Sequence, residues 1–475
     1  MVLKDIYLWL FTLKNQAELE VKKIGFISSL KRNRKLILIF LISVIIQIAL
    51  LIIFQVFNWV SQHAINTPWF KFLMNTLEPY SDYTYWYQRF AKQFFYEKWL
   101  PYFNVPTNPN KYRNLLLYII DIIMGNKDLS FIYPPFFFYS IIIPASINIE
   151  LVFLPLFLSN LLLPIVVYKF LVIFTKKKVA KWGFIATALS PLLIFYNGGL
   201  LLNTSYVTLF FVIALYFMSL KRFTWAIFFL SVACLFKQTT IFFFLPFLIY
   251  IVLVSTEKDS NHIHFVYFKK LLKYSGIFIG ILFLGSIPWI ILEPFNYIES
   301  LMADQSITFN PQFNLPGYNF PMKWYSFLIQ FGAPYWLLYI LGFLMFTFIG
   351  ILLIEIIAMF MLYNWGRKGS LDWLKFLDII VYTAFISHLF FPRGVYKYYF
   401  TFHVPLVILW ICFHFKDKLV DNDFFRKLWL FLFISVSFVI LIFPRLYYLI
   451  IIWILFFIIV KINRTQNRKR SNPAF

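Results

Sequence analysis

The chain is poor in charged residues, and acidic residues are especially few. Only 13% of its 475 residues are charged, with 20 Asp or Glu against 43 Lys or Arg, whereas 61% are hydrophobic. Soluble globular chains are about 25% charged and about 45–50% apolar. With a mean hydropathy of +0.76, this chain has more apolar surface than a water-soluble core encloses. The composition excludes a soluble globular protein and predicts an all-α polytopic membrane protein.

Cysteine and the common catalytic motifs are also scarce. The two cysteines, Cys234 and Cys412, each lie within an apolar run, and their spacing predicts neither a metal site nor a disulfide. The sequence has no Gly-rich phosphate loop, no His/Cys cluster and no Ser nucleophile elbow. It therefore offers no motif for nucleotide binding, a structural metal centre or serine hydrolase chemistry.

Positive charge, by contrast, is in large excess, with a formal net charge of +23. Membrane proteins accumulate Lys and Arg in their cytoplasmic loops. Nucleic-acid binding is the alternative, but no basic run here is interleaved with aromatic residues on a soluble domain. We attribute the charge to membrane orientation and expect no nucleic-acid partner.

Apolar runs near span length recur along the chain, and a membrane-crossing helix needs about 20 apolar residues. The first run has no cleavage signature after it, so we expect a retained helix and no signal peptide. We predict twelve spans, at 36–57, 150–174, 182–197, 204–219, 223–236, 240–255, 274–292, 334–362, 374–390, 400–415, 428–443 and 446–460.

Clusters of Lys and Arg between these spans set the orientation, because such clusters mark the cytoplasmic side. This orientation places both termini in the cytoplasm. We expect the membrane to be a plasma membrane or an endoplasmic reticulum membrane. The predicted organisation is a cytoplasmic segment 1–35, the first span, an extracytoplasmic loop 58–149, spans within 150–292, a second extracytoplasmic loop 293–332, spans within 333–460 and a cytoplasmic tail 461–475.

Residues 131–147 are apolar but broken by Pro134, Pro135 and Pro144. If this stretch crossed the membrane, every later basic cluster would fall outside, against the charge bias. We therefore predict a juxtamembrane or re-entrant element there, and an interfacial helix at 112–123.

The distribution of polar residues favours an enzyme over a transporter. Transporters mostly keep loops short and place ionisable groups within spans. Here the exceptions within spans are Glu355 and Asp378, whereas other polar groups collect in the outer loops and at the outer ends of spans. Such a pattern is typical of chemistry at the extracytoplasmic membrane surface.

The first outer loop contains a candidate carboxylate, Asp82, preceded by Glu78 and followed by Arg89 and Lys92. Residues 82–95 lack Gly and Pro and are predicted to be helical, which places Asp82 and Arg89 on one helical face. Asp82 would then act as a helix cap or as a catalytic group, and the pattern leaves both readings open.

Two further groups of polar residues lie at outer span ends. Lys237 and Gln238 join two spans, where a lysine anchors at the interface or binds a ligand. Arg393 and Lys397 precede Tyr398, and His403 follows. This second group has two possible roles. It anchors the chain at the membrane interface, or it binds an anionic headgroup, in which case Arg393 contacts the phosphate through two hydrogen bonds.

The order of these features resembles the glycosyltransferase C superfamily, the integral-membrane enzymes that use polyprenyl-phosphate sugars. Within it the chain looks most like hexosyltransferases that assemble lipid-linked glycans. The resemblance is carried by Asp82-Tyr83 with Trp86, Leu100-Pro101-Tyr102, Tyr133-Pro134-Pro135, Ser190-Pro191 with Tyr196-Asn197, Phe236-Lys237-Gln238 with Leu245-Pro246, and Arg393 with Lys397-Tyr398-Tyr399.

The resemblance implies a fold with juxtamembrane helices in the first outer loop, and an inverting mechanism. Asp82 would be the general base, since inversion needs no glycosyl-enzyme intermediate. Some members of the family require a divalent cation such as Mg or Mn, and others do not. Residues expected to bind substrate are Glu78, Arg89, Tyr133, Lys237, Gln238, Arg393, Lys397, Tyr398 and His403.

The leading hypothesis is therefore transfer of mannose or glucose from a polyprenyl- or dolichyl-phosphate donor to a lipid-linked glycan acceptor. A polymerase or ligase of lipid-linked polysaccharide is the second, and a lipid-sugar transporter the third. A polymerase would not depend on Asp82, and a transporter would place charged residues in mid-membrane.

Overall fold

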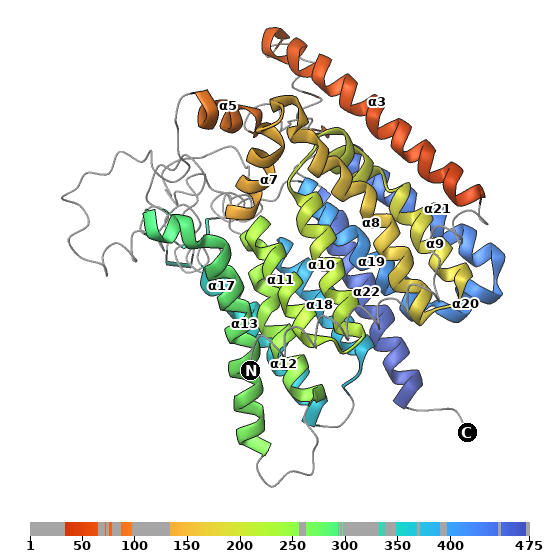
Figure 1. Cartoon of the computed structure of the whole chain (residues 1–475). Helices are drawn as coiled ribbons and strands as arrows, with labels where there is room; N and C mark the ends of the chain where they lie inside the picture. The colour runs from red at the N-terminus through yellow and green to blue at the C-terminus, as the bar shows by residue number, and fades with distance from the viewer. Residues whose placement is uncertain are drawn as a thin grey trace.

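The computed structural model describes residues 34–64, 72, 76–77, 87–96, 134–255, 263–292, 294, 297, 332–334, 336–337, 348–367, 371–389, 397–444 and 448–471. Regular structure within these ranges is helical throughout, with no strand (Figure 1). The prediction of a helical membrane protein is confirmed for this part of the chain.

The helices match the predicted apolar runs. The longer ones are α3 (Arg34–Ala64), α5 (Gln88–Tyr96), α7 (Pro135–Ala145), α8 (Phe153–Phe174), α9 (Lys177–Ala188), α10 (Thr204–Ser219), α11 (Phe223–Phe236), α12 (Phe244–Ser255), α13 (Ile263–Leu292), α17 (Phe348–Arg367), α18 (Trp373–Leu389), α19 (His403–His414), α21 (Asp423–Ile442) and α22 (Tyr448–Ser471). Shorter elements are η2 (Ile149–Val152), η3 (Leu193–Gly199), η4 (Gln238–Phe243), η6 (Lys397–Phe402) and α20 (Lys416–Asp421).

Each predicted span contains or overlaps one of these helices. Within the described ranges, five helical stretches are long and apolar enough to cross a membrane, or six if the bent pair α9–η3 counts as one. The five are Arg34–Phe54, Ile149–Phe174, Gln238–Ser255, Val266–Leu292 and Asp423–Ile442. The figure of twelve crossings stays a prediction.

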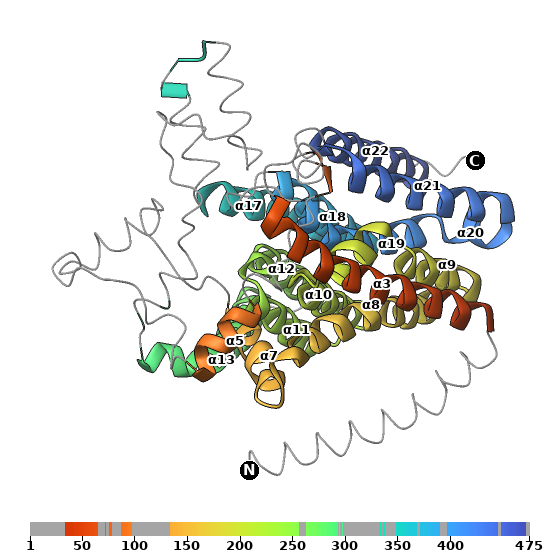
Figure 2. The ribbon, with the colours of Figure 1, turned by 90° about the horizontal axis from the view of Figure 1, so that it is seen from above.

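The helices divide into a buried bundle and a periphery whose apolar faces are exposed. Helix α3 lies along the outside of the bundle (Figures 1 and 2), and large apolar side chains such as Ile45 and Ile52 are exposed on it. The main core surrounds Trp182, Phe211 and Trp410, all buried. Exposed apolar helix faces beside such a core are expected where lipid is the solvent.

Helices α5 and α7 lie at one end of the molecule and α20 lies at the other (Figures 1 and 2). Helix α7 has 11 residues, so it rises only about 16 Å, roughly half the thickness of the bilayer core. It does not cross by itself, and Phe137 and Phe138 bury against a second, smaller core that also includes Tyr87 of the α5 segment. The predicted interfacial helix at 112–123 lies outside the described residues.

A bend shapes the end near α7. Helix α9 and η3 meet at 58° across the break that holds Ser190 and Pro191. Helix α3 approaches η3 closely at Gly198. A Cβ added to Gly198 would lie 2.4 Å from Gln47 Oε1, so only glycine leaves room for the Gln47 side chain. The turn after η3 passes through Leu201 at φ 55°, a strained backbone for a non-glycine residue. These features bring Asn197 and Asn203 inside the bundle.

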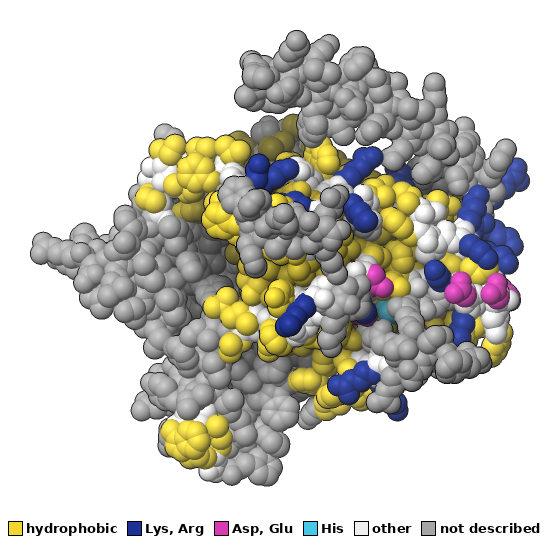
Figure 3. Space-filling view, turned by 90° about the horizontal axis from the view of Figure 1, so that it is seen from below, with side chains coloured by type: hydrophobic (Ala, Val, Ile, Leu, Met, Phe, Trp, Pro, Cys, Tyr) yellow, Lys and Arg dark blue, Asp and Glu magenta, His cyan; other side chains and the backbone are white. Residues whose placement is uncertain are grey.

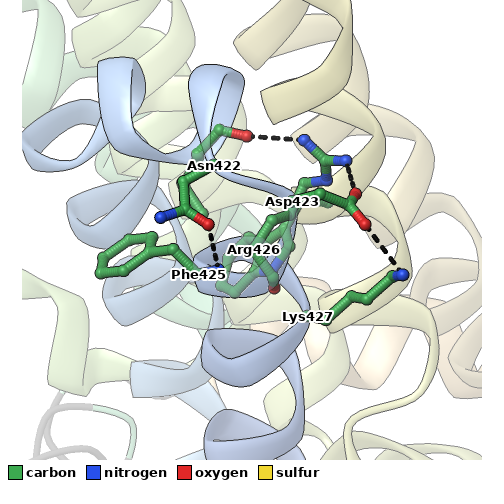
Figure 4. Close-up of polar contacts among 7 residues, drawn as sticks. Asn422, Asp423, Phe425, Arg426 and Lys427 are labelled. Atoms are coloured by element: carbon green, nitrogen blue, oxygen red, sulfur yellow. Dashed lines mark hydrogen bonds and ion pairs between the residues drawn. The ribbon is translucent and has the colours of Figure 1, made fainter.

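The end near α20 is basic. Lys and Arg side chains gather at the right-hand edge of Figure 3, where α20 lies in Figure 1, with acidic side chains beside them. Asp423 pairs there with Arg426 and, at 2.8 Å, with Lys427, whereas Asn422 caps α21 by accepting from the Phe425 amide at 2.9 Å (Figure 4). The predicted layout places this end in the cytoplasm.

Candidate functional site

A buried lysine lies where α11 and η4 meet, near α7. Lys237 is only 7% exposed, and its Nζ donates to Asn203 Oδ1 at 3.2 Å. The same Nζ lies 4.0 Å from the centroid of the Tyr399 ring and 5.5 Å from that of Tyr398. An amide oxygen and two aromatic faces therefore stabilise an ammonium that burial would otherwise disfavour.

The backbone explains why Lys237 points inward. Helix α11 ends at Phe236, and Lys237 is extended, with φ −158° and ψ 123°, before η4 begins at Gln238. The ring of Phe236 stacks on that of Tyr206 at 4.5 Å between centroids, which fixes the end of α11 against α10. The break in the helix thus sets the place of the lysine.

Hydroxyl and amide groups extend the polar cluster. The Thr204 hydroxyl donates to Asn197 Oδ1 at 2.8 Å, and Thr401 Oγ1 lies 3.1 Å from Thr204 Oγ1. The side-chain amide nitrogens of Asn197 and Asn203 are buried without a hydrogen-bond partner among the described residues. Buried unsatisfied donors are uncommon in proteins, so this cluster has spare capacity to bind an acceptor.

A cavity of about 50 Å³ adjoins Lys237, with room for a few water molecules. Its polar lining comes from α10, η4, α18, η6 and α19, with Lys237 at the break between α11 and η4. The lining residues are Thr204, Val207, Lys237, Thr239, Phe242, Phe243, Ala384, Ser387, His388, Tyr399, Phe402 and His403.

Two buried histidines, His388 and His403, also line this cavity. His403 Nε2 lies 2.8 Å from the Ala384 carbonyl oxygen, and its ring stacks on that of Phe400 at 4.8 Å between centroids. The His388 ring lies 4.8 Å from the His403 ring, and its Nε2 lies 3.3 Å from the Tyr448 hydroxyl. Both side chains thus have fixed orientations at the wall of the cavity.

Lys397 lies beside this cluster and makes a different set of contacts. Its side chain is fully buried, and Nζ donates to the carbonyls of Thr76, Phe443 and, at 2.9 Å, Leu441. Tyr196 donates its hydroxyl to the neighbouring Leu77 carbonyl at 2.9 Å. Two side chains therefore bind consecutive residues of the first loop.

The structure brings some of the predicted site residues together. Lys237, Tyr398 and His403 lie around one cluster, and Gln238 follows Lys237 at the start of η4. Arg89 is exposed on α5, away from the buried face formed by Tyr87, Phe90 and Ala91. Four predicted residues lie outside the described part of the chain: Glu78, Asp82, Tyr133 and Arg393.

Sequence reasoning missed the amide and hydroxyl groups of this cluster. Asn203, Thr204 and Thr401 were not singled out as site residues, although Asn203 follows the Asn197-Gly198-Gly199 turn at a predicted outer hairpin. Polar residues at such a turn are the signal that would have found them. Asn203 and Thr204 also begin a glycosylation sequon, but Asn203 is only 1% exposed.

Glu355 and Asp378, the acidic residues within the predicted spans, do not line this cavity. Asp378 accepts hydrogen bonds from Trp410 Nε1 at 3.0 Å and His414 Nε2 at 2.8 Å, which ties α18 to α19 near α20. Glu355 is buried on α17. In the ranges that the structure describes, no three His, Cys, Asp or Glu side chains group closely enough to hold a metal ion.

No protein-family model matches the chain, and a search of curated proteins finds no relative of it.

Proposed function

We propose that this protein is an inverting membrane glycosyltransferase. It moves a hexose, mannose or glucose, from a polyprenyl-phosphate donor to a lipid-linked glycan acceptor on the extracytoplasmic face of a plasma membrane or endoplasmic reticulum. The observation that carries the proposal is the buried Lys237, held by Asn203 and Tyr399 at the wall of a small, largely apolar cavity that several polar side chains also line.

A buried cation of this kind suits a lipid phosphate. Ionisable residues inside membrane bundles are costly and usually functional. A polyprenyl phosphate presents its anionic group at the interface with its chain in the bilayer, and positive charge beside that group stabilises the charge that develops on it as the sugar leaves. Lys237 supplies this charge, and the amides of Asn197 and Asn203 supply nearby donors.

Asp82 is the proposed general base. It would take the proton of the acceptor hydroxyl as that oxygen attacks the anomeric carbon, while the bond from this carbon to the phosphate oxygen breaks and polyprenyl phosphate departs. One carboxylate suffices for this single displacement with inversion. Asp82 follows Leu77 by five residues, a length of chain that spans at most about 18 Å, and Leu77 is bound beside the cluster.

A donor screen tests the proposal. Membranes containing the protein are supplied with radiolabelled dolichyl- or undecaprenyl-phosphate mannose or glucose, and the labelled lipid products are identified. We expect one of these donors to label a lipid-linked glycan in a reaction that Lys237→Met slows at low donor concentration. Transfer from no donor, or transfer indifferent to Lys237, would contradict the proposal.

A further inference from the structure

Positive charge is concentrated at the start of α9, directly after α8 ends. The lysines there, which we call the α9 lysines, are Lys176, Lys177, Lys178 and Lys181. The first three are exposed and the fourth is half-buried. Among the residues that the structure describes, none of the four pairs with a carboxylate, whereas Arg426 and Lys427 of α21 both pair with Asp423. The described part of the chain therefore leaves the charge of the α9 lysines without a counter-charge.

The backbone holds these lysines on a short corner between two helices. Helix α8 ends at Phe174, and Thr175 closes its last turn by donating its amide and its hydroxyl to the Leu171 carbonyl, at 2.8 and 2.6 Å. Helix α9 follows at once, with the Val179 amide donating to the Lys176 carbonyl at 2.9 Å. The α9 lysines are thus set by the ends of two helices and do not belong to a long loop.

An exposed apolar face of α8 leads up to this corner. The stretch Ile149–Phe174 is long and apolar enough to cross a membrane. Its residues Leu158, Leu162 and Ile173 are exposed, as is Lys169, and their spacing of four or seven residues places all of them on one helical face. A lysine near the end of a span extends its ammonium toward the lipid headgroups. The surface therefore combines an apolar face with cations at its end.

The corner lies at the end of the bundle away from Lys237. Helix α9 packs against α20 and α21, and Trp182 Nε1 of α9 donates to the Arg426 carbonyl of α21 at 3.0 Å. Lys237 instead lies near α7, at the opposite end from α20 (Figure 1). Whatever binds the α9 lysines is therefore separate from the cavity beside Lys237.

A phospholipid with an anionic headgroup matches both parts of this surface. Its phosphate meets the lysines while its acyl chains lie on the apolar face of α8, and basic segments beside a span attract anionic lipids. An anion also relieves an unfavourable arrangement, because cations at a helix N-terminus oppose the helix dipole, and α9 has no acidic residue in its first turn. A nucleic acid or an acidic peptide would match the lysines but would leave the apolar face without a partner.

We propose that the corner between α8 and α9 binds an anionic phospholipid of the leaflet that borders α20. Lys176, Lys177 and Lys178 bind the lipid phosphate, and Lys169 extends to the same headgroup from α8. This lipid is neither the donor nor the acceptor of the proposed reaction, so the inference stands independently of hexose transfer.

The test titrates the purified protein in detergent with phosphatidylglycerol, which is anionic, and separately with phosphatidylcholine or inorganic phosphate. Lys177→Gln/Lys178→Gln removes two exposed α9 lysines. The matched control, Lys416→Gln/Lys418→Gln, removes the same charge from exposed positions of α20 at the same end of the molecule. Native mass spectrometry counts the lipid bound at each concentration, and Tm is recorded with each ligand.

We expect wild type to bind phosphatidylglycerol more tightly than phosphatidylcholine. Affinity for phosphatidylglycerol should fall about tenfold or more in the α9 double variant and stay within about threefold of wild type in the α20 control. Phosphatidylglycerol should raise the Tm of wild type and control more than that of the α9 variant. Without lipid, the α9 variant should be at least as stable as wild type, because it has fewer cations at a helix N-terminus.

Three results would overturn the proposal. The first is equal affinity for phosphatidylglycerol in wild type and the α9 double variant. The second is an equal loss in the α20 control, which would assign the effect to net charge and not to this corner. The third is stabilisation of wild type by inorganic phosphate as large as that by phosphatidylglycerol, which would assign the corner to a soluble anion.

Discussion

Lys237 Nζ lies 4.0 Å from the centroid of the Tyr399 ring, so the one lysine at the α11–η4 break faces an aromatic side chain of η6. A desolvated cation–π contact is worth on the order of 2 kcal/mol. We predict that Tyr399→Leu raises the donor KM roughly tenfold or more, whereas Tyr399→Phe, which keeps the ring, changes it less than threefold. Initial rates over a range of donor concentrations check this, and equal effects of the two substitutions would contradict it.

The glycines of η3 give a prediction about stability. A Cβ on Gly198 would lie 2.4 Å from Gln47 Oε1, whereas a Cβ on Gly276 or Gly280 of α13 would have no atom within 4 Å. We expect Gly198→Ala to lower the free energy of unfolding by about 1–3 kcal/mol. Gly276→Ala should leave stability unchanged or raise it by up to about 1 kcal/mol.

Thermal unfolding in one detergent compares the two glycine variants. We expect a lower Tm for Gly198→Ala and an unchanged or higher Tm for Gly276→Ala. A wild-type Tm for Gly198→Ala would contradict the close contact between Gly198 and the Gln47 side chain.

We predict that the hydrogen bonds of Asp378 contribute to the stability of the fold and not to hexose transfer. Asp378→Ala leaves Trp410 Nε1 and His414 Nε2 without their buried acceptor, which costs about 1–3 kcal/mol. We expect a lower Tm but unchanged transfer per folded molecule, because these residues lie apart from the cavity beside Lys237. A loss of kcat at wild-type Tm would instead assign Asp378 to the chemistry.

Cysteine labelling tests the orientation. Cys234 and Cys412 are buried, so they give little background with a membrane-impermeant maleimide. Asn148→Cys, at an exposed position near α7, should react in intact cells, whereas Lys418→Cys, exposed on α20, should react only after permeabilisation. The reverse pattern would invert the predicted topology.

The helices could be predicted from sequence, but their ends could not. Apolar runs identify the part of a helix that lies in lipid, whereas polar turns extend it beyond the bilayer. Thus α3 continues to Ala64, past the predicted end at 57. Helix α13 begins at Ile263, whereas the predicted span begins at 274. The 58° bend at Ser190-Pro191 interrupts the apolar run 182–197, for which the sequence predicts a single span.

The candidate site was predictable only in part. A lysine at an outer span junction could be read from sequence, and Lys237 lies in the cluster. Its partner Asn203 is 34 residues away, and such pairing depends on tertiary packing. Lys397 and Tyr398 are adjacent, yet the first binds backbone carbonyls and the second faces Lys237. Sequence spacing does not distinguish such neighbours on a tight helical turn.

Asp82 is the proposed base in hexose transfer from a polyprenyl phosphate. Asp82→Asn keeps the shape of the side chain and removes its basicity. Single-turnover transfer of radiolabelled hexose, measured with saturating donor in nanodiscs, tests it most directly. We predict a rate at least about a thousandfold lower, with donor binding retained. Turnover within a few-fold of wild type would show that Asp82 is not the base.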